Sequence, residues 1–97
     1  MNELDRVGWK ILNATADDWE NLEQIFGLVN AQETTPLEVV ADRVRTLVEG
    51  GLLTARLPDC PEPLADFRDL SYVWRAWFRM TPEGRSSWSA SPHAAAV

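Results

Sequence analysis

Apolar residues recur every three to four positions through the first half of the chain, which is the spacing of amphipathic helices. The pattern predicts a first helix over residues 4–14. A second helix is expected to begin within Thr15–Asp18, where a capping side chain precedes acids, and to continue from Trp19 to Val29. Trp9 lies off the centre of the first apolar stripe, so it either extends the core sideways or serves a second interface.

A third helix has the clearest boundary signals. The segment Thr35–Glu38 (TPLE) offers a threonine N-cap, a proline at the first helical position and a glutamate where a capping box needs one. An apolar stripe then continues to Val48, and Gly50-Gly51 supplies the left-handed residue that ends a helix. We therefore expect this helix to begin at Thr35 and to end before the two glycines.

The second half of the chain changes to the alternating, aromatic pattern of strands. Leu52–Pro58 and Tyr72–Met80 are predicted to pair as a hairpin, joined by a polar loop over residues 59–71. In the second strand, alternation directs one set of side chains toward the core: Tyr72, Trp74, Ala76, Phe78 and Met80. The other set faces outward: Val73, Arg75, Trp77 and Arg79.

A second threonine-proline pair, Thr81-Pro82, predicts a short final helix that returns Trp88 to the core. Residues 89–97 are small and aperiodic, and we expect them to form a disordered tail. The 97 residues, 45% of them hydrophobic, suffice for one core, so a single domain over residues 1–88 is expected.

Two stretches resemble a known family. Val40–Leu53 (VADRVRTLVEGGLL) resembles the "helix, Leu-x-x-x-Gly-Leu-Leu, strand" signature of MarR-like and PadR-like bacterial regulators. Phe78–Arg85 (FRMTPEGR) is similar to the segment that leaves the wing in the same families. The resemblance implies an α+β, mainly α, winged helix-turn-helix fold with three helices, a two-stranded antiparallel wing and a short C-terminal helix.

The formal net charge of −6 makes this an acidic protein and excludes a broad basic coat for nucleic acid. The charge is uneven: residues 1–42 hold nine acids against two basic residues, whereas residues 43–97 hold seven arginines against six acids. The chain has no long apolar run, and its start lacks the basic segment of a secretory signal, so we expect a cytoplasmic protein outside the membrane.

The resemblance implies a small DNA-binding transcriptional regulator that docks on double-stranded DNA as a homodimer. Its DNA contacts would come from the start of the third helix, from arginines of that helix and from arginines of the wing: Thr34, Thr35, Arg43, Arg45, Arg56, Arg75 and Arg79. Two acids, Glu38 and Asp42, lie in the first turns of the same helix, where a carboxylate repels phosphate.

The alternative is a winged-helix module that binds protein, such as an antitoxin, an immunity-like or inhibitory factor, or an adaptor. Trp9, Trp77 and the acidic second helix would then contact the partner. Trp77 has a second interpretation as a structural tryptophan that a cation–π contact holds in place. A third hypothesis is an acidic decoy that occupies the nucleic-acid site of another protein.

Catalytic residues are scarce. His93 is the only histidine and lies in the predicted tail, and no glycine-rich phosphate loop occurs. The acids of Asp17–Glu23 lack the spacing of a calcium loop and are expected to be a solvated helix start. We therefore predict no enzymatic activity, no metal and no cofactor, and for the single cysteine, Cys60, either a redox-sensing role or none.

Overall fold

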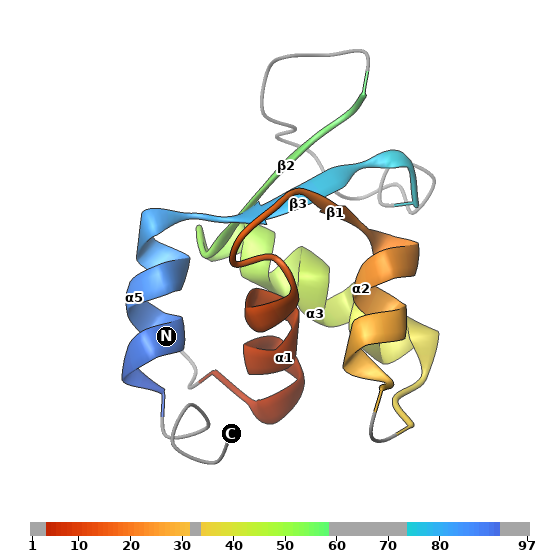
Figure 1. The fold of residues 1–97 in the computed structure, drawn as a ribbon, viewed down its shortest axis with the longest axis horizontal. Helices are drawn as coiled ribbons and strands as arrows, with labels where there is room; N and C mark the ends of the chain where they lie inside the picture. The colour runs from red at the N-terminus through yellow and green to blue at the C-terminus, as the bar shows by residue number, and fades with distance from the viewer. Residues whose placement is uncertain (1–3, 32–33, 59–73, 92–97) are drawn as a thin grey trace.

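The computed structural model describes residues 4–31, 34–58 and 74–91 of the chain. In these ranges the fold is α+β and mainly helical, with four helices and a three-stranded antiparallel sheet. The elements are, in order, α1 (Arg6–Ala14), β1 (Glu20–Asn21), α2 (Leu22–Val29), α3 (Leu37–Glu49), β2 (Leu53–Arg56), β3 (Trp77–Met80) and α5 (Pro82–Ala90). All of these helices lie on one side of the sheet, which therefore has a helix-covered face and an outer face (Figure 1).

Helix α1 confirms the first predicted helix. Asp5 is its N-cap, because the Gly8 amide donates to Oδ1 of Asp5 at 2.7 Å. Thr15 is its C-cap, with a buried hydroxyl that donates to the Ile11 carbonyl at 3.0 Å. Thr15 therefore ends α1, and the prediction that it begins the second helix is wrong. The Thr15 carbonyl accepts from the Met80 amide at 3.1 Å, which fastens the end of β3 to α1.

Helix α2 begins at Leu22 and not at Trp19, so the predicted start is wrong. The Asn21 side chain accepts from the Gln24 amide at 2.8 Å, and the Gln24 side chain accepts from the Asn21 amide at 3.0 Å. These two bonds form a complete capping box. Asn21 is also the second residue of β1, a strand that the sequence analysis did not predict.

Helix α3 confirms the predicted apolar stripe, but its start differs from the prediction. Pro36 is the N-cap and receives no side-chain hydrogen bond, so the capping box expected from Thr35 and Glu38 is absent. The Thr35 amide donates to Oδ1 of Asn30, and Thr35 is buried. Thr35 is therefore bound to Asn30, the C-cap of α2, and does not cap α3.

The end of α3 confirms the two-glycine stop. Gly51 has a φ of 79°, which is the left-handed region that favours glycine. Its amide donates to the Val48 carbonyl at 3.1 Å, and the Leu52 amide donates to the Leu47 carbonyl at 2.9 Å. This pair of bonds is a Schellman motif, and it directs the chain from α3 into β2.

Strand β3 is the centre of the sheet, whose order is β1-β3-β2. In the antiparallel register Trp77 lies opposite Asn21 on one side and Arg56 on the other. The next pair, Ala55 and Phe78, is buried on the helix-covered face. Because successive side chains alternate, Arg56 and Trp77 belong to the outer face.

The second predicted strand is shorter than Tyr72–Met80. Trp74 and Arg75 have helical backbone, and the strand begins at Trp77. Trp74, which was predicted to be in the core, is 50% exposed, so that prediction is wrong. The rest of the predicted inward set in the described residues is buried: Ala76, Phe78 and Met80. Tyr72, Val73 and the predicted loop over 59–71 lie outside the described residues.

Helix α5 confirms the second threonine-proline start, because Thr81 Oγ1 accepts from the Gly84 amide at 3.0 Å. Near its end, Trp88 stacks on Trp9 with 6.3 Å between ring centroids. Trp9 Nε1 donates to the Trp88 carbonyl at 3.1 Å, and Trp9 is only 7% exposed. Both tryptophans thus pack α5 against α1. The helix continues to Ala90, so the predicted tail begins too early, and residues 92–97 lie outside the described ranges.

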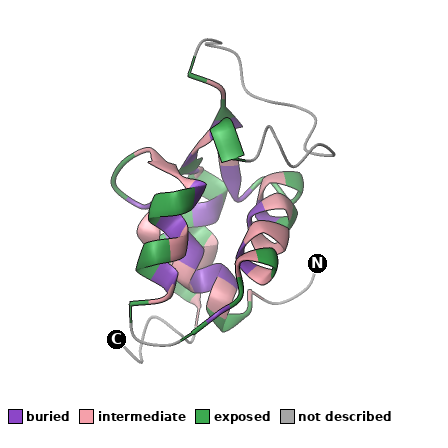
Figure 2. Ribbon diagram, turned by 90° about the vertical axis from the view of Figure 1, so that its right-hand side faces the viewer, coloured by how far each residue is buried: buried purple, intermediate pink, exposed green. Residues whose placement is uncertain are grey.

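The core lies between the helices and the covered face of the sheet (Figure 2). Phe78 is its largest fully buried side chain, followed by Ile11 and Leu12 of α1 and by Leu22 and Ile25 of α2. Burial of side chains of this size contributes about 1.5–3 kcal/mol each. In the part of the chain that the structure describes, no helix is both long enough and apolar enough to cross a membrane.

Candidate functional site

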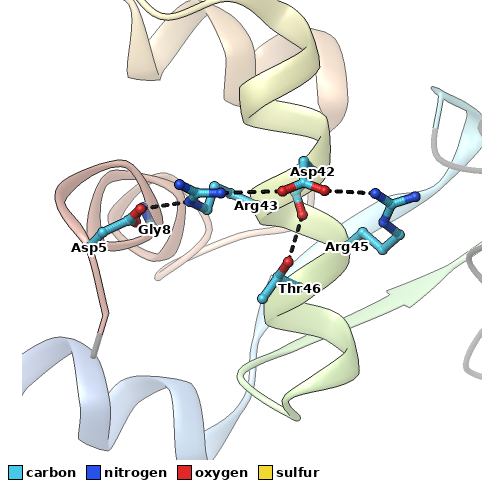
Figure 3. A network of polar contacts seen from close by, with 6 residues as sticks. All are labelled: Asp5, Gly8, Asp42, Arg43, Arg45 and Thr46. Atoms are coloured by element: carbon cyan, nitrogen blue, oxygen red, sulfur yellow. Dashed lines mark hydrogen bonds and ion pairs between the residues drawn. The ribbon is translucent and has the colours of Figure 1, made fainter. Parts of the chain in front are cut away.

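The arginines of α3 are held in a network of ion pairs (Figure 3). Asp42 lies between them: its Oδ1 is 2.7 Å from Nη2 of Arg45, and its Oδ2 is 3.2 Å from Nη1 of Arg43. Arg43 also donates from Nε to Oδ2 of Asp5, the N-cap of α1, at 2.6 Å. The network therefore joins α1 to α3 and neutralises both cations.

The charge that α3 presents is consequently unsuited to phosphate. The helix carries three acids, Glu38, Asp42 and Glu49, against two arginines. The hydrogen bond from Arg43 to Asp5, together with the charge of Asp5, raises the pKa of Arg43, so its guanidinium stays ionised and paired. The side chains of each ion pair are more than a third exposed, so each ion pair is weak by itself. A phosphate must still compete with Asp5 and Asp42 for the guanidinium groups of Arg43 and Arg45.

A second group of predicted residues lies on the outer face of the sheet. Arg56 and Trp77 are cross-strand partners, and Arg79 lies opposite Thr54 two residues further along β3. Arg56 and Arg79 are exposed, whereas Trp77 is half-buried. We call this surface the outer sheet face, and it consists of Trp19, Asn21, Thr54, Arg56, Trp77 and Arg79.

Trp19 joins the outer sheet face from the segment just before β1. The Cζ atom of Arg56 lies 4.3 Å from the centroid of its ring, which is a cation–π contact. Because Arg56 belongs to β2 and β3 is the central strand, this contact bridges the two edges of the sheet. Sequence reasoning placed Trp19 in the second helix and missed this role. The capping pair Asn21 and Gln24 is the local signal that could have placed the helix start after Trp19.

The arginines of the outer sheet face differ from those of α3 in their partners. Among residues 4–31, 34–58 and 74–91, no carboxylate forms an ion pair with Arg56 or Arg79. Arg75 precedes β3 and is also exposed. The remaining cation–π contact in these ranges joins Arg85 to Trp88, at 5.9 Å, and the Arg85 guanidinium also donates to the Ala16 carbonyl.

The other predicted contact residues are dispersed. Thr34 is exposed just before α3, but Thr35 is buried. Trp9, a candidate for partner contact, is in the core beneath α5. Cys60 and His93 lie outside the described residues. Within the described ranges, the structure contains no group of three or more His, Cys, Asp or Glu residues that could hold a metal ion.

Comparison with known proteins gives no matching family model, no significantly similar curated protein and no significantly similar solved structure. The function must therefore be inferred from the two arginine groups and the tryptophans around them.

Proposed function

We propose that this chain is a protein-binding module of the winged-helix type and that the outer sheet face is its binding surface. The order of three helices followed by the β2–β3 hairpin supports the winged helix-turn-helix assignment. The observation that carries the proposed function is the contrast between the arginines. Those of α3 are paired with acids, whereas Arg56 and Arg79 have no carboxylate partner among the described residues.

The composition of the outer sheet face also favours protein binding. Tryptophan and arginine dominate the hot spots of protein interfaces, because each combines a large apolar area with hydrogen-bond donors. Trp19 and Trp77 are both half-buried, so their rings are already supported by the sheet while part of each remains exposed. A rigid platform of this kind loses little side-chain entropy on binding. An adaptor, antitoxin or inhibitory factor would use the surface in this way.

Double-stranded DNA is the second candidate partner, because exposed arginines lie on or next to the hairpin that would form the wing. Arg56, Arg75 and Arg79 are all exposed there and could contact phosphates. Against this, Glu38 and Asp42 lie in the first turns of α3, which would have to enter the major groove. A regulator of this kind would therefore hold DNA mainly through its wing.

A titration with duplex DNA separates the two candidates. Fluorescence anisotropy of labelled genomic fragments is measured with the full chain at about 50 mM and about 200 mM salt. A protein-binding module should show no saturable binding at either concentration. Saturable binding that weakens with salt, and that is lost in an Arg56→Ala/Arg79→Ala variant, would overturn the proposal in favour of DNA.

The protein arm of the test is capture from an extract of the source cells. A specific partner should be recovered at least about tenfold less well by a Trp77→Ala variant, the cost expected for a hot-spot tryptophan. Leu28→Ala is the matched control, because Leu28 is 54% exposed on α2 and outside the outer sheet face. Equal loss in both variants, with the fold intact by circular dichroism, would refute this surface as the binding site.

A further inference from the structure

We infer that the partner of the outer sheet face is an acidic protein segment that places two carboxylates against Arg56 and Arg79 and an apolar side chain against Trp77. This inference rests on the proposed function and narrows the partner to one chemical class. It starts from an imbalance of charge: the described outer sheet face holds two arginines and no acid.

The spacing of the two arginines matches an extended peptide. Arg56 is opposite Trp77 and Thr54 is opposite Arg79, so the arginines are diagonal neighbours on adjacent strands. The Cα atoms of such neighbours are about 7–8 Å apart, and their side chains leave the same face of the sheet. Alternate residues of an extended chain project to the same side at intervals of about 6.6 Å. Two acids at alternate positions of an extended chain therefore match the spacing at which Arg56 and Arg79 leave the sheet. An apolar side chain of the same segment can contact Trp77, which lies directly opposite Arg56.

The cation–π contact with Trp19 holds the Arg56 guanidinium in one position, in which it can bind a carboxylate. Its guanidinium is held over the Trp19 ring, which fixes the head group of an otherwise flexible side chain. A planar guanidinium can give two parallel hydrogen bonds to one carboxylate, and a head group already held in place loses less entropy when it does so. Arg79 supplies a second, exposed donor on the same face.

A nucleic acid fits the same surface less well. The Arg56 guanidinium already covers one side of the Trp19 ring. A base that stacks on that side would have to displace the guanidinium and would lose the cation–π contact. The exposed Asp17 and Asp18 immediately precede Trp19, and Oδ1 of Asp18 accepts from the Trp19 amide at 2.8 Å. A polyanion that extends past the two arginines would meet these carboxylates, whereas a peptide with only two acids need not.

The test is selection of peptides from a displayed library of random dodecamers against the full chain. Selected sequences should be enriched in Asp or Glu at alternate positions and should also carry an apolar residue close to these acids. The strongest sequence is then synthesised and its dissociation constant is measured by fluorescence anisotropy. An Arg56→Ala/Arg79→Ala variant should bind it about a hundredfold more weakly, about tenfold for each charge-assisted hydrogen-bonding group that is lost.

A variant of equal net charge controls for long-range electrostatics. Leu28→Glu/Ala31→Glu adds two negative charges at exposed positions of the α2 end, and the double alanine variant removes two positive ones, so both change the net charge from −6 to −8. The control should bind the peptide within about threefold of wild type, because exposed distant charges are screened by salt.

The results separate this inference from the proposed function. The selected peptides could bind through Trp77, with binding lost in Trp77→Ala, and yet show no enrichment in acids. That result would overturn the inference of an acidic partner but would still support the outer sheet face as a protein-binding surface. Binding that falls equally in the double alanine variant and in the control would also overturn it. Failure to select any peptide, combined with saturable binding of a labelled single-stranded oligonucleotide or duplex, would overturn both.

Discussion

Substitution of Gly84 by alanine should destabilise the protein strongly, although Gly84 lies in a helix. The residue is in the first turn of α5, where a Cβ would be 2.1 Å from the carbonyl oxygen of Leu52 and 2.9 Å from Cγ of Met80. Outside its own residue and chain neighbours, a Cβ atom essentially never lies closer than 3.0 Å to another heavy atom. The Leu52 carbonyl is itself held by the Thr81 amide, at 3.1 Å. The start of α5 must therefore move away from the turn between α3 and β2.

The required movement sets the magnitude of the destabilisation by Gly84→Ala. The gap must open by at least 0.9 Å, the difference between 2.1 and 3.0 Å, against a backbone atom that cannot change rotamer. Overpacking of this kind costs about 1–3 kcal/mol, and we expect the upper end. The better helix propensity of alanine offsets about 1 kcal/mol of this cost. The net loss of about 2 kcal/mol should lower the melting temperature by roughly 8–16 °C for a domain of this size.

Thermal and urea unfolding followed by circular dichroism measure this loss. Gly27→Ala is the matched control, because Gly27 is also helical and exposed, and a Cβ there would meet no heavy atom within 4 Å beyond its own helix backbone and chain neighbours. That variant should be more stable than wild type by about 0.5–1 kcal/mol. If Gly84→Ala is as stable as wild type, or gains stability as Gly27→Ala does, the close contact of α5 with the Leu52 carbonyl is refuted.

Three further variants test other contacts by urea unfolding. Gly51→Ala should cost about 1–2 kcal/mol, because alanine is strained at a φ of 79°, and an unchanged midpoint would contradict the left-handed turn after α3. Trp9→Phe should cost at least about 0.5–1.5 kcal/mol through loss of the hydrogen bond to the Trp88 carbonyl, and no loss would show that this bond contributes nothing. Asp42→Asn should cost about 1 kcal/mol or less, with a smaller cost in high salt. The folded-state pKa of Arg43 is raised, so the stability that its ion pairs contribute is fully present at any pH below the ordinary arginine pKa. The loss of stability in Asp42→Asn should therefore be the same at pH 7 and pH 9, and a difference between the two would contradict the pairing.

The same local signal predicted one helix start correctly and another incorrectly. Threonine-proline pairs precede both α3 and α5, yet only Thr81 caps its helix. The N-cap of α3 is Pro36, the residue after Thr35, and Thr35 is buried with its amide bound to the Asn30 side chain. The same dipeptide thus has two outcomes, so it does not by itself determine where the helix begins.

The alternation of residues in β3 predicted which side chains lie on the covered face of the sheet, but the sequence did not predict strand β1. Alternation correctly predicted that Phe78 and Met80 are buried and that Trp77 and Arg79 face outward. Strand β1 has only two residues, too few for a period of two to be visible, and it exists because it pairs with β3. Without β1, nothing in the sequence placed Trp19 beside the hairpin.

The pairing of the arginines is likewise a property of the tertiary structure. Asp5 and Arg43 are 38 residues apart in the chain, and packing of α1 against α3 brings them together. Sequence reasoning treated the arginines of α3 and of the hairpin as one set of phosphate contacts. The fold divides them into a paired group on α3 and a group on the outer sheet face without carboxylate partners among the described residues.

The most direct test of the outer sheet face is to follow the tryptophan indole resonances by ¹H–¹⁵N NMR while the selected acidic dodecamer is added. The chain has five tryptophans, and Trp→Phe variants assign their five indole signals. The signals of Trp19 and Trp77 should shift with saturation, whereas those of the core pair Trp9 and Trp88 should not. Saturable shifts that spare Trp19 and Trp77 and instead affect the backbone amides of α3 would contradict the account.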